Sequence, residues 1–214
     1  KHELWATTIE SHFPEGSDGP EVTPGFHTEA LPYYVEGIHS RVRDAETYEE
    51  YPILCITGRR IPVYFHSEPR QLPWCRELWP VPRMEINPAD AERLGIEQGD
   101  WCWIETRRGR IKMRANVSPE LDPRVVFAPR GWWFPERDGS ADLSNPFGCL
   151  ESNVNVLTSV DVEDCDPMGG SWANRGLMCR VYKCTELDHD YKPADAQCCL
   201  LYTSPSPRDR TRSR

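Results

Sequence analysis

The sequence lacks the closely spaced thiols that metal clusters need. It has nine cysteines among 214 residues, but no two of them form a Cys-x-x-Cys pair. Zinc and iron–sulfur sites are commonly built from such pairs, so neither is expected in this chain. An odd number of cysteines at scattered positions also argues against a disulfide scaffold. Cys55, Cys102 and Cys179 lie within apolar, strand-like runs, where we expect buried thiols that act as small hydrophobic groups.

Long apolar runs and a basic face are also missing. No apolar run approaches the ~18 residues that indicate a membrane span, and residues 1–10 lack the apolar stretch of a signal peptide. A formal net charge of −9 without a basic face argues against nucleic-acid binding. Because the chain does not begin with Met, we interpret it as part of a longer polypeptide. Any targeting signal would then lie upstream, and the compartment stays unknown.

Both ends of the chain differ from its centre. Residues 1–50 are rich in proline, glycine and glutamate, which predicts an extended arm with little core of its own. Residues 185–199 are polar, and we expect a loose segment. Residues 200–214 carry four arginines against one aspartate, have no apolar period, and resemble a translated sequencing adapter of the kind left on metagenomic reads. The alternative for this last segment is a genuine basic tail.

The region from 51 to 184 is dominated by short β-forming runs. Its only clear helix signal covers 88–94, with Asn87 as the cap, Pro88 in the first turn and Gly95 at the end. Several short strands with one or two helices predict a mainly β fold, either a closed barrel or a compact sheet. The predicted strands are 53–57, 61–65, 101–106, 110–115, 124–128 and 178–183, and the stretch that begins at residue 84 is interpreted as a strand leading into the helix.

Three segments, in order, carry a resemblance to a known family. Residues 86–111 follow the pattern I-N-P-x-x-A-x-x-L-G-I-x-x-G-D-x-x-x-I-E-T-x-x-G-x-I. Upstream, Thr57-Gly58-Arg59 follows an apolar run, and downstream Asn155-Val156-Leu157-Thr158 is similar to the family motif N-x-L-T. Over about residues 51–184 the chain resembles the C-terminal molybdopterin dinucleotide-binding domain of the dimethyl-sulfoxide-reductase family. The aromatic run 131–134 and Ser171-Trp172 resemble the acetylene-hydratase-like and catechol-dehydroxylase-like branch.

This resemblance implies a six-stranded double-psi β-barrel, preceded by the extended arm. It implies a bis(molybdopterin guanine dinucleotide) cofactor with molybdenum or tungsten, which this domain would bind and orient within an oxidoreductase. The metal ligand and the iron–sulfur cluster would lie in missing upstream domains, so the fragment alone is not expected to be active. The implied partners are those upstream catalytic domains and an iron–sulfur electron-transfer subunit. Two rivals stay open: a non-redox hydratase on the same scaffold, and a double-psi barrel used as a protein-interaction module.

A turn after the first predicted strand supplies the first candidate site residues. Glycine lets a backbone approach a ligand closely, and arginine can clamp a phosphate through two hydrogen bonds. The alternative is an ordinary turn with solvated arginines. In the loop that follows, the resemblance implies a histidine, a hydroxyl and an arginine that face the pterin, although a lone histidine is often structural. The candidates in these two segments are Thr57, Gly58, Arg59, Arg60, His66, Ser67 and Arg70.

The second group of candidates comes from the asparagine-rich segment. Asn153 and Asn155 are two residues apart, so on an extended segment they would share a face, and an amide suits the polar edge of a pterin. The alternative is an asparagine-rich turn. The resemblance adds Thr158 and Arg175. We expect segments 57–60, 66–70 and 153–158 to meet on one concave surface, because a closed barrel brings distant strand ends together.

Overall fold

The computed structural model describes residues 36–37, 39–58, 61–159, 161 and 175–185. Short helices and six strands make up this part of the chain. In chain order the elements are α2 (Ala45–Glu50), β1 (Ile53–Ile56), α3 (Pro73–Leu78), β2 (Arg83–Ile86), α4 (Pro88–Leu94), β3 (Trp101–Thr106), β4 (Gly109–Val117), β5 (Val125–Phe127), the 3₁₀-helices η1 (Pro146–Gly148) and η2 (Val154–Leu157), and β6 (Arg175–Lys183).

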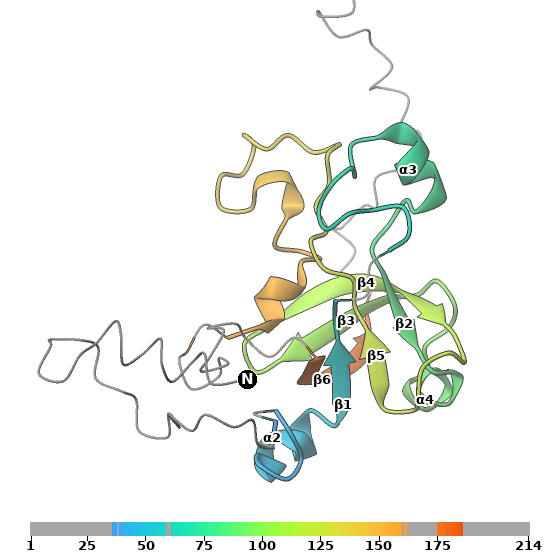
Figure 1. The fold of residues 1–214 in the computed structure, drawn as a ribbon, viewed down its shortest axis with the longest axis vertical. Helices are drawn as coiled ribbons and strands as arrows, with labels where there is room; N and C mark the ends of the chain where they lie inside the picture. The colour runs from blue at the N-terminus through green and yellow to red at the C-terminus, as the bar shows by residue number, and fades with distance from the viewer. Residues whose placement is uncertain (1–35, 38, 59–60, 160, 162–174, 186–214) are drawn as a thin grey trace, which may run out of the picture.

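The six strands close into a barrel in the order β1-β5-β2-β4-β3-β6 (Figure 1). β1 pairs in parallel with β5, and β2 pairs in parallel with β4. The four remaining contacts around the barrel are antiparallel. The predicted fold class, a mainly β barrel with short helices, is therefore confirmed. Most of the predicted N-terminal arm and the whole of 186–214 lie outside the described residues.

Helix α4 forms where the sequence predicts it. The Asn87 side chain accepts a hydrogen bond from the Ala89 amide at 2.9 Å, which satisfies one of the free donors of the first turn. Pro88 needs no partner at that position. Gly95 ends the helix in the left-handed conformation, with a φ of 65°. The cap, the proline and the terminal glycine all indicate the same helix, so this helix can be predicted without knowledge of tertiary contacts.

The run 61–65 is not a strand, and that prediction is wrong. Pro62 has no amide hydrogen to give to a neighbouring strand. The Tyr64 amide instead donates to the Ile61 carbonyl, which closes a turn. Ile61 and Tyr64 are then buried in a second apolar cluster with Trp132 and Phe134, apart from the barrel core. The apolar residues of this run therefore pack through a turn rather than through a strand.

Two short helices were not predicted. Pro73 occupies the first turn of α3, but Trp74 and Leu78 of that helix are exposed, so the segment shows no buried apolar stripe. Helix α2 forms within the segment expected to be extended. Its cap is Asp44, whose carboxylate accepts from the Thr47 amide at 3.1 Å. No residue of α2 is buried, which explains why hydrophobic periodicity gives no signal for it.

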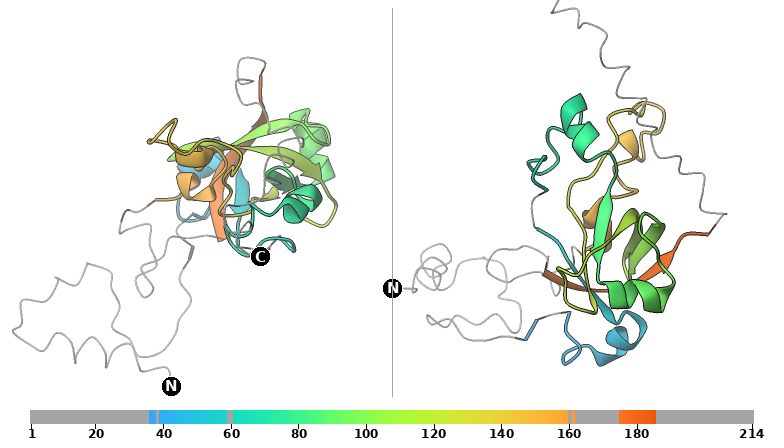
Figure 2. Two further views of the ribbon diagram at one scale, coloured as in Figure 1. Left: turned by 90° about the horizontal axis from the view of Figure 1, so that it is seen from above. Right: turned by 90° about the vertical axis from the view of Figure 1, so that its right-hand side faces the viewer.

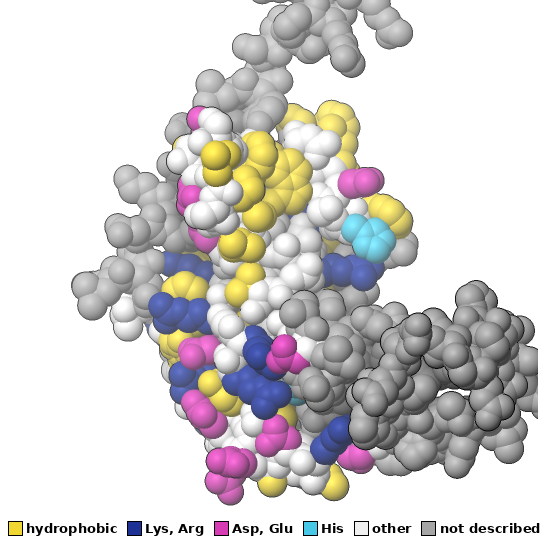
Figure 3. Space-filling model, turned by 90° about the vertical axis from the view of Figure 1, so that its left-hand side faces the viewer, with side chains coloured by type: hydrophobic (Ala, Val, Ile, Leu, Met, Phe, Trp, Pro, Cys, Tyr) yellow, Lys and Arg dark blue, Asp and Glu magenta, His cyan; other side chains and the backbone are white. Residues whose placement is uncertain are grey.

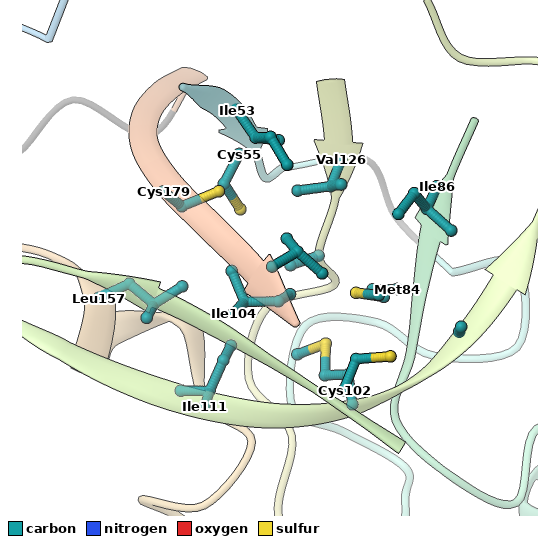
Figure 4. Packing of buried hydrophobic residues seen from close by; sticks show 14 of the residues in the cluster. Ile53, Cys55, Met84, Ile86, Cys102, Ile104, Ile111, Val126, Leu157 and Cys179 are labelled. Carbon is teal, nitrogen blue, oxygen red and sulfur yellow. The ribbon is translucent and has the colours of Figure 1, made fainter. Parts of the chain in front are cut away.

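The barrel interior is filled by apolar side chains and by thiols (Figure 4). Cys55, Cys102 and Cys179 are fully buried there, as predicted, and none is in a disulfide. Burial raises the pKa of Cys102 to about 12 and raises the pKa of Cys179 well above its ordinary value. The thiols of Cys102 and Cys179 are therefore protonated at neutral pH and act as small hydrophobic groups.

The barrel has two distinct ends. At one end β1 and β5 finish, β2 and β6 begin, and the β3–β4 hairpin turns. At the other end lie α4, which connects β2 to β3, and α2, which leads into β1. Figures 1 and 2 show α3 and the segment after β5 on the first end, opposite α2 and α4. No helix among the described residues is long and apolar enough to span a membrane.

Candidate functional site

Thr57 is a buried hydroxyl at the exit of β1. Only 4% of the residue is exposed, and its Oγ1 has no hydrogen-bond partner among the described residues. A buried hydroxyl without a partner costs free energy, and buried polar groups in folded proteins nearly always have one. An orphaned group of this kind at a strand end is therefore a candidate for contact with a ligand.

Gly58 continues the chain in a conformation that side chains disfavour. Its φ is +111°, and a Cβ built on it would meet nothing within 4 Å. A larger residue at this position would be strained by its backbone conformation rather than by a clash of its side chain. The space beside the glycine is therefore open. Arg59 and Arg60, the predicted phosphate clamp, lie outside the described residues.

The exit of β1 lies between two other chain segments. The Ala128 amide donates to the Ile56 carbonyl at 3.0 Å, so the chain leaving β5 runs beside Thr57. On the other side Ile56 pairs with Arg175, the first residue of β6. The backbone of Arg175 therefore lies next to the predicted turn, while its side chain is outside the described part of the structure.

His66 and Ser67 occupy the centre of an exposed turn. The Glu68 amide donates to the Phe65 carbonyl at 2.9 Å, which closes the turn. His66 has a φ of +53°, and its ring packs edge-on against Phe65. The Ser67 carbonyl accepts from the Trp133 indole N–H at 2.7 Å. Both predicted residues are thus on the surface, where a ligand can reach them.

Arg70 is placed behind this turn rather than on it. The residue is fully buried, and its guanidinium lies 4.3 Å from the Trp132 ring centre and 4.4 Å from that of Tyr64. Its Nε donates to the Gly131 carbonyl, and its Nη2 lies 3.1 Å from the carbonyl oxygens of both His66 and Arg130. Direct contact with a ligand would need an exposed face, which Arg70 does not have. The structure instead makes it a support of the turn.

Arg130 and Gly131 lie beside the predicted turn, and the sequence prediction did not include them. Gly131 has a φ of +70°, and a Cβ there would lie 3.3 Å from the Ser67 amide nitrogen. The chain after β5 therefore passes Ser67 at backbone distance, which only glycine allows. The Pro129-Arg130-Gly131 sequence after a strand was the available signal, because this composition is typical of turns. Of the aromatic run, Trp132 and Phe134 pack in the second apolar cluster.

The prediction that Asn153 and Asn155 share one face of an extended segment is wrong. The Asn153 carbonyl oxygen Oδ1 accepts from the Asn155 amide at 3.1 Å and caps η2. In a 3₁₀-helix residues two apart point in different directions. Asn155 is exposed, while the Thr158 hydroxyl donates to the Asn155 carbonyl at 2.8 Å. Asn153 is therefore a capping residue, and Asn155 is the amide of this pair that is open to a ligand.

Helix η2 nevertheless lies at the same end of the barrel as Thr57. The Thr106 hydroxyl, at the β3–β4 hairpin, donates to the Leu157 carbonyl at 2.9 Å. Leu157 also shares a small hollow with Leu177 and Met178 of β6. Because Leu177 pairs with Cys55 of β1, the helix and the β1 exit are separated by one strand only. Among the described residues the candidates thus gather at one end, although no described cavity joins them all.

Apolar side chains are exposed around this end. Figure 3 shows hydrophobic side chains gathered on the upper part of one face, while charged side chains predominate below. An exposed apolar patch on a folded protein commonly marks an interface with another protein surface. The large exposed apolar residues in α3, in the turn before it and in the segment after β5 are Phe65, Trp74, Leu78, Leu143, Phe147 and Leu150.

A family model described as "Molydopterin dinucleotide binding domain" matches residues 53–173, which is more than half of the chain. The chain belongs to this family. The match begins at β1 and includes the Thr57-Gly58 turn, the 65–68 turn and η2. The recognition made from the three sequence motifs is therefore confirmed.

Relatives from the dimethyl-sulfoxide-reductase family support the same assignment. Over 212 residues the chain is 42% identical to a dopamine dehydroxylase of Eggerthella lenta, covering 97% of this chain and 19% of that protein. It is 31% identical to the acetylene hydratase of Syntrophotalea acetylenica, covering 72% and 21%. The solved acetylene hydratase from Pelobacter acetylenicus superposes with a TM-score of 0.70 at 28% identity, covering 85% and 23%. The chain thus spans about a fifth of the length of these relatives.

Proposed function

We propose that this domain binds and orients a bis(molybdopterin guanine dinucleotide) cofactor, with molybdenum or tungsten, within a longer oxidoreductase. Membership of the dinucleotide-binding family supports the cofactor class. The residue that carries the proposal is Thr57, because its buried hydroxyl has no partner among the described residues and the space beside Gly58 is open. A polar ligand at this turn would supply the missing hydrogen bond.

The residues present fit the chemistry of such a cofactor. A dinucleotide offers phosphate oxygens, which accept hydrogen bonds from hydroxyl, amide and guanidinium donors, and a pterin edge with both donors and acceptors. We propose contacts from Thr57, the Gly58 backbone, His66, Ser67 and the Asn155 amide. Arg59, Arg60, Thr158 and Arg175 remain proposed contacts on the sequence argument. When bound, the cofactor would supply the electron transfer or Lewis-acid chemistry, while these residues bind and orient it.

The exposed apolar side chains support a place for this domain in a larger protein. We propose that they contact catalytic domains of the same polypeptide, which would also hold the metal ligand and any iron–sulfur cluster. An electron-transfer subunit is a further proposed partner. A non-redox hydratase is the second candidate function, favoured by the structural likeness to acetylene hydratase. Both candidates need the same cofactor-binding role from this chain.

The test is a pair of measurements on Thr57→Val, which removes the hydroxyl and keeps the shape. In this chain without cofactor, the variant should be as stable as the parent or more stable by up to about 1–3 kcal/mol, because an orphaned buried hydroxyl is lost. In the longer enzyme the same variant should lower the metal and guanine nucleotide content per protein. Urea unfolding and analysis of the purified enzyme give the two values.

Thr106→Val is the matched control, since the Thr106 hydroxyl already has a partner in the Leu157 carbonyl. It should destabilise the cofactor-free chain. Arg59→Ala in the longer enzyme should lower cofactor content, whereas substitution of the exposed Glu97, beyond α4 at the opposite end, should not. Full cofactor content in both Thr57→Val and Arg59→Ala would refute the proposed site.

A further inference from the structure

Arg70 gathers three carbonyl groups from two separate chain segments. His66 belongs to the turn before α3, while Arg130 and Gly131 follow β5, and all three carbonyl oxygens lie within 3.1 Å of a guanidinium nitrogen. One Nη2 serves the carbonyls of both His66 and Arg130. The two segments are therefore oriented by a single buried cation.

The direction of these carbonyls fixes the direction of the amides that follow them. In a trans peptide the C=O and the N–H of one unit point in opposite directions. The His66 and Arg130 carbonyls point toward the Arg70 guanidinium, so the amide N–H groups of Ser67 and Gly131 point away from it. No acceptor for either of these two N–H groups is found within the described residues.

These two amides also lie next to each other. A Cβ on Gly131 would lie 3.3 Å from the Ser67 nitrogen, so the two backbones approach each other closely at this point. His66 and Gly131 both have positive φ values, a backbone conformation that also occurs in turns whose N–H groups bind anions. The Ser67 hydroxyl is exposed on the same turn and adds a third donor.

The electrostatics of this place favour a negative ligand. Burial lowers the pKa of Arg70 only to about 10, so the group is charged at neutral pH. No carboxylate in the described part of the chain pairs with Arg70, whereas the neighbouring Arg76 is neutralised by Glu136 at 2.8 Å. Arg130 is half-buried and likewise makes no ion pair with the described residues. Arg70 lies behind the peptide units of the Ser67 and Gly131 amides, and Arg130 directly precedes Gly131 in the chain, so both positive charges are close to these amides.

We propose that Arg70 is a positioning residue that turns the Ser67 and Gly131 amides toward one diphosphate group, with Arg130 as the cation beside it. The proposal rests on the proposed function, since the diphosphate would be that of the dinucleotide cofactor. It adds a specific cradle, made of two backbone N–H groups, the Ser67 hydroxyl and the Arg130 guanidinium. Thr57, on the neighbouring segment, is not required for it.

Amide NMR of the full 214-residue chain, titrated with inorganic pyrophosphate, tests the cradle directly. The Ser67 and Gly131 amide resonances should shift with a single saturable binding curve. Equal ionic strength supplied as sodium chloride should not produce the same shifts. Amides of α4, at the opposite end of the barrel, should stay in place throughout the titration.

Three variants separate positioning from simple charge. Arg70→Lys keeps the charge, but its single nitrogen cannot occupy both the Nε and the Nη2 positions from which the guanidinium donates. The Ser67 and Gly131 resonances should therefore move before any ligand is added, and binding should weaken at least tenfold. Arg130→Met should weaken pyrophosphate binding by a similar factor and leave the free-state Ser67 resonance in place. Arg93→Met, the same change on α4, should leave binding unchanged.

Pyrophosphate shifts confined to other amides, or wild-type binding in both Arg70→Lys and Arg130→Met, would overturn the proposal. If Arg70→Lys does not fold, the titration of the parent chain and of Arg130→Met still decides the question. The outcome is separable from that of the proposed function. Absence of shifts at Ser67 and Gly131, together with cofactor loss in Thr57→Val, would remove the cradle and leave the cofactor-binding role intact.

Discussion

Asp90 connects two segments that are distant in the sequence. Its carboxylate accepts from the Arg124 amide at 2.5 Å and from the Arg93 guanidinium at 2.7 Å, and only 3% of the residue is exposed. Arg124 has a φ of +66°, an unfavourable conformation for a residue with a side chain. The carboxylate therefore holds a strained turn against the first turn of α4.

We predict that Asp90→Asn lowers the free energy of unfolding by about 1–3 kcal/mol, because a neutral amide accepts fewer and weaker bonds than a buried carboxylate. Urea unfolding followed by circular dichroism measures the change. Glu92→Gln, an exposed change on the same helix, should stay within about 0.5 kcal/mol of the parent. An unchanged urea midpoint for Asp90→Asn would show that the turn at Arg124 does not depend on the Asp90 carboxylate.

Sequence reasoning at the scale of single residues succeeds where the partner is local. Asn87 and Gly95 could be assigned to the ends of α4, since their partners lie within the same helix. The sequence also places Asp90 in a first turn, but its bond to Arg124 depends on how β5 passes α4. Arg70 shows the same limit, because its hydrogen bonds to Arg130 and Gly131 join residues that only the fold brings together.

Strands β3 and β6 are joined on their outer side by a polar cluster. The Glu105 carboxylate accepts from the Arg180 guanidinium at 2.8 Å and from the Tyr182 hydroxyl at 2.5 Å. The hydrogen bond from Arg180 is the main cause that holds the pKa of Glu105 below its ordinary value, and the bond from Tyr182 acts in the same direction. A carboxylate with a lowered pKa in the folded state stabilises the fold above its unfolded pKa.

We therefore predict that the free energy of unfolding decreases as the pH falls below about 4.5, the ordinary pKa of glutamate. The decrease should continue until the pH has passed the lower pKa that Glu105 has in the folded state. Glu105→Gln should flatten this part of the curve of unfolding free energy against pH. Denaturant titrations between pH 3 and pH 7 provide the curve. The exposed Glu77→Gln should keep the parent curve, and an equally steep curve in Glu105→Gln would contradict the prediction.

A helix or strand could be predicted from the sequence when the residues that determine it lie within the element itself. The strands 101–106, 110–115 and 178–183 carry β-forming residues that pair with one another, so their approximate bounds could be predicted. Helix α3 and the turn at 61–65 depend on packing around Trp132, which no local pattern reveals. Helix η2 depends on a cap by Asn153, an interaction equally typical of turns.

For the whole molecule, closure of the barrel depends on its last strand. β6 pairs with both β1 and β3, and it contributes Leu177, Cys179 and Val181 to the core. We predict that a chain ending at Asn174 has no cooperative thermal transition, because both neighbouring strands lose a partner and the core loses one wall. A chain ending at Gln197 should keep the melting temperature of the full chain. Circular dichroism melting curves compare the three lengths.

A cooperative transition in the chain that ends at Asn174 would show that five strands suffice. A drop of several degrees in the chain that ends at Gln197 would show that residues 198–214 are a native, packed part of the protein rather than an adapter-derived tail. The overall barrel was predictable through the family resemblance. Composition and strand spacing alone left a closed barrel and a compact sheet as equal alternatives.

The position of β1 in the barrel also governs how the chain folds. β1 is the first of the described strands to be synthesised, yet its two neighbours, β5 and β6, are the last two of them. Contacts between residues so distant in sequence close slowly, because a large loop must be ordered before they form. On the ribosome β1 stays an unpaired edge until β6 has emerged, and an unpaired apolar strand invites aggregation. The exit of β1, where Thr57 lies, is therefore enclosed on both sides only after β6 has been synthesised.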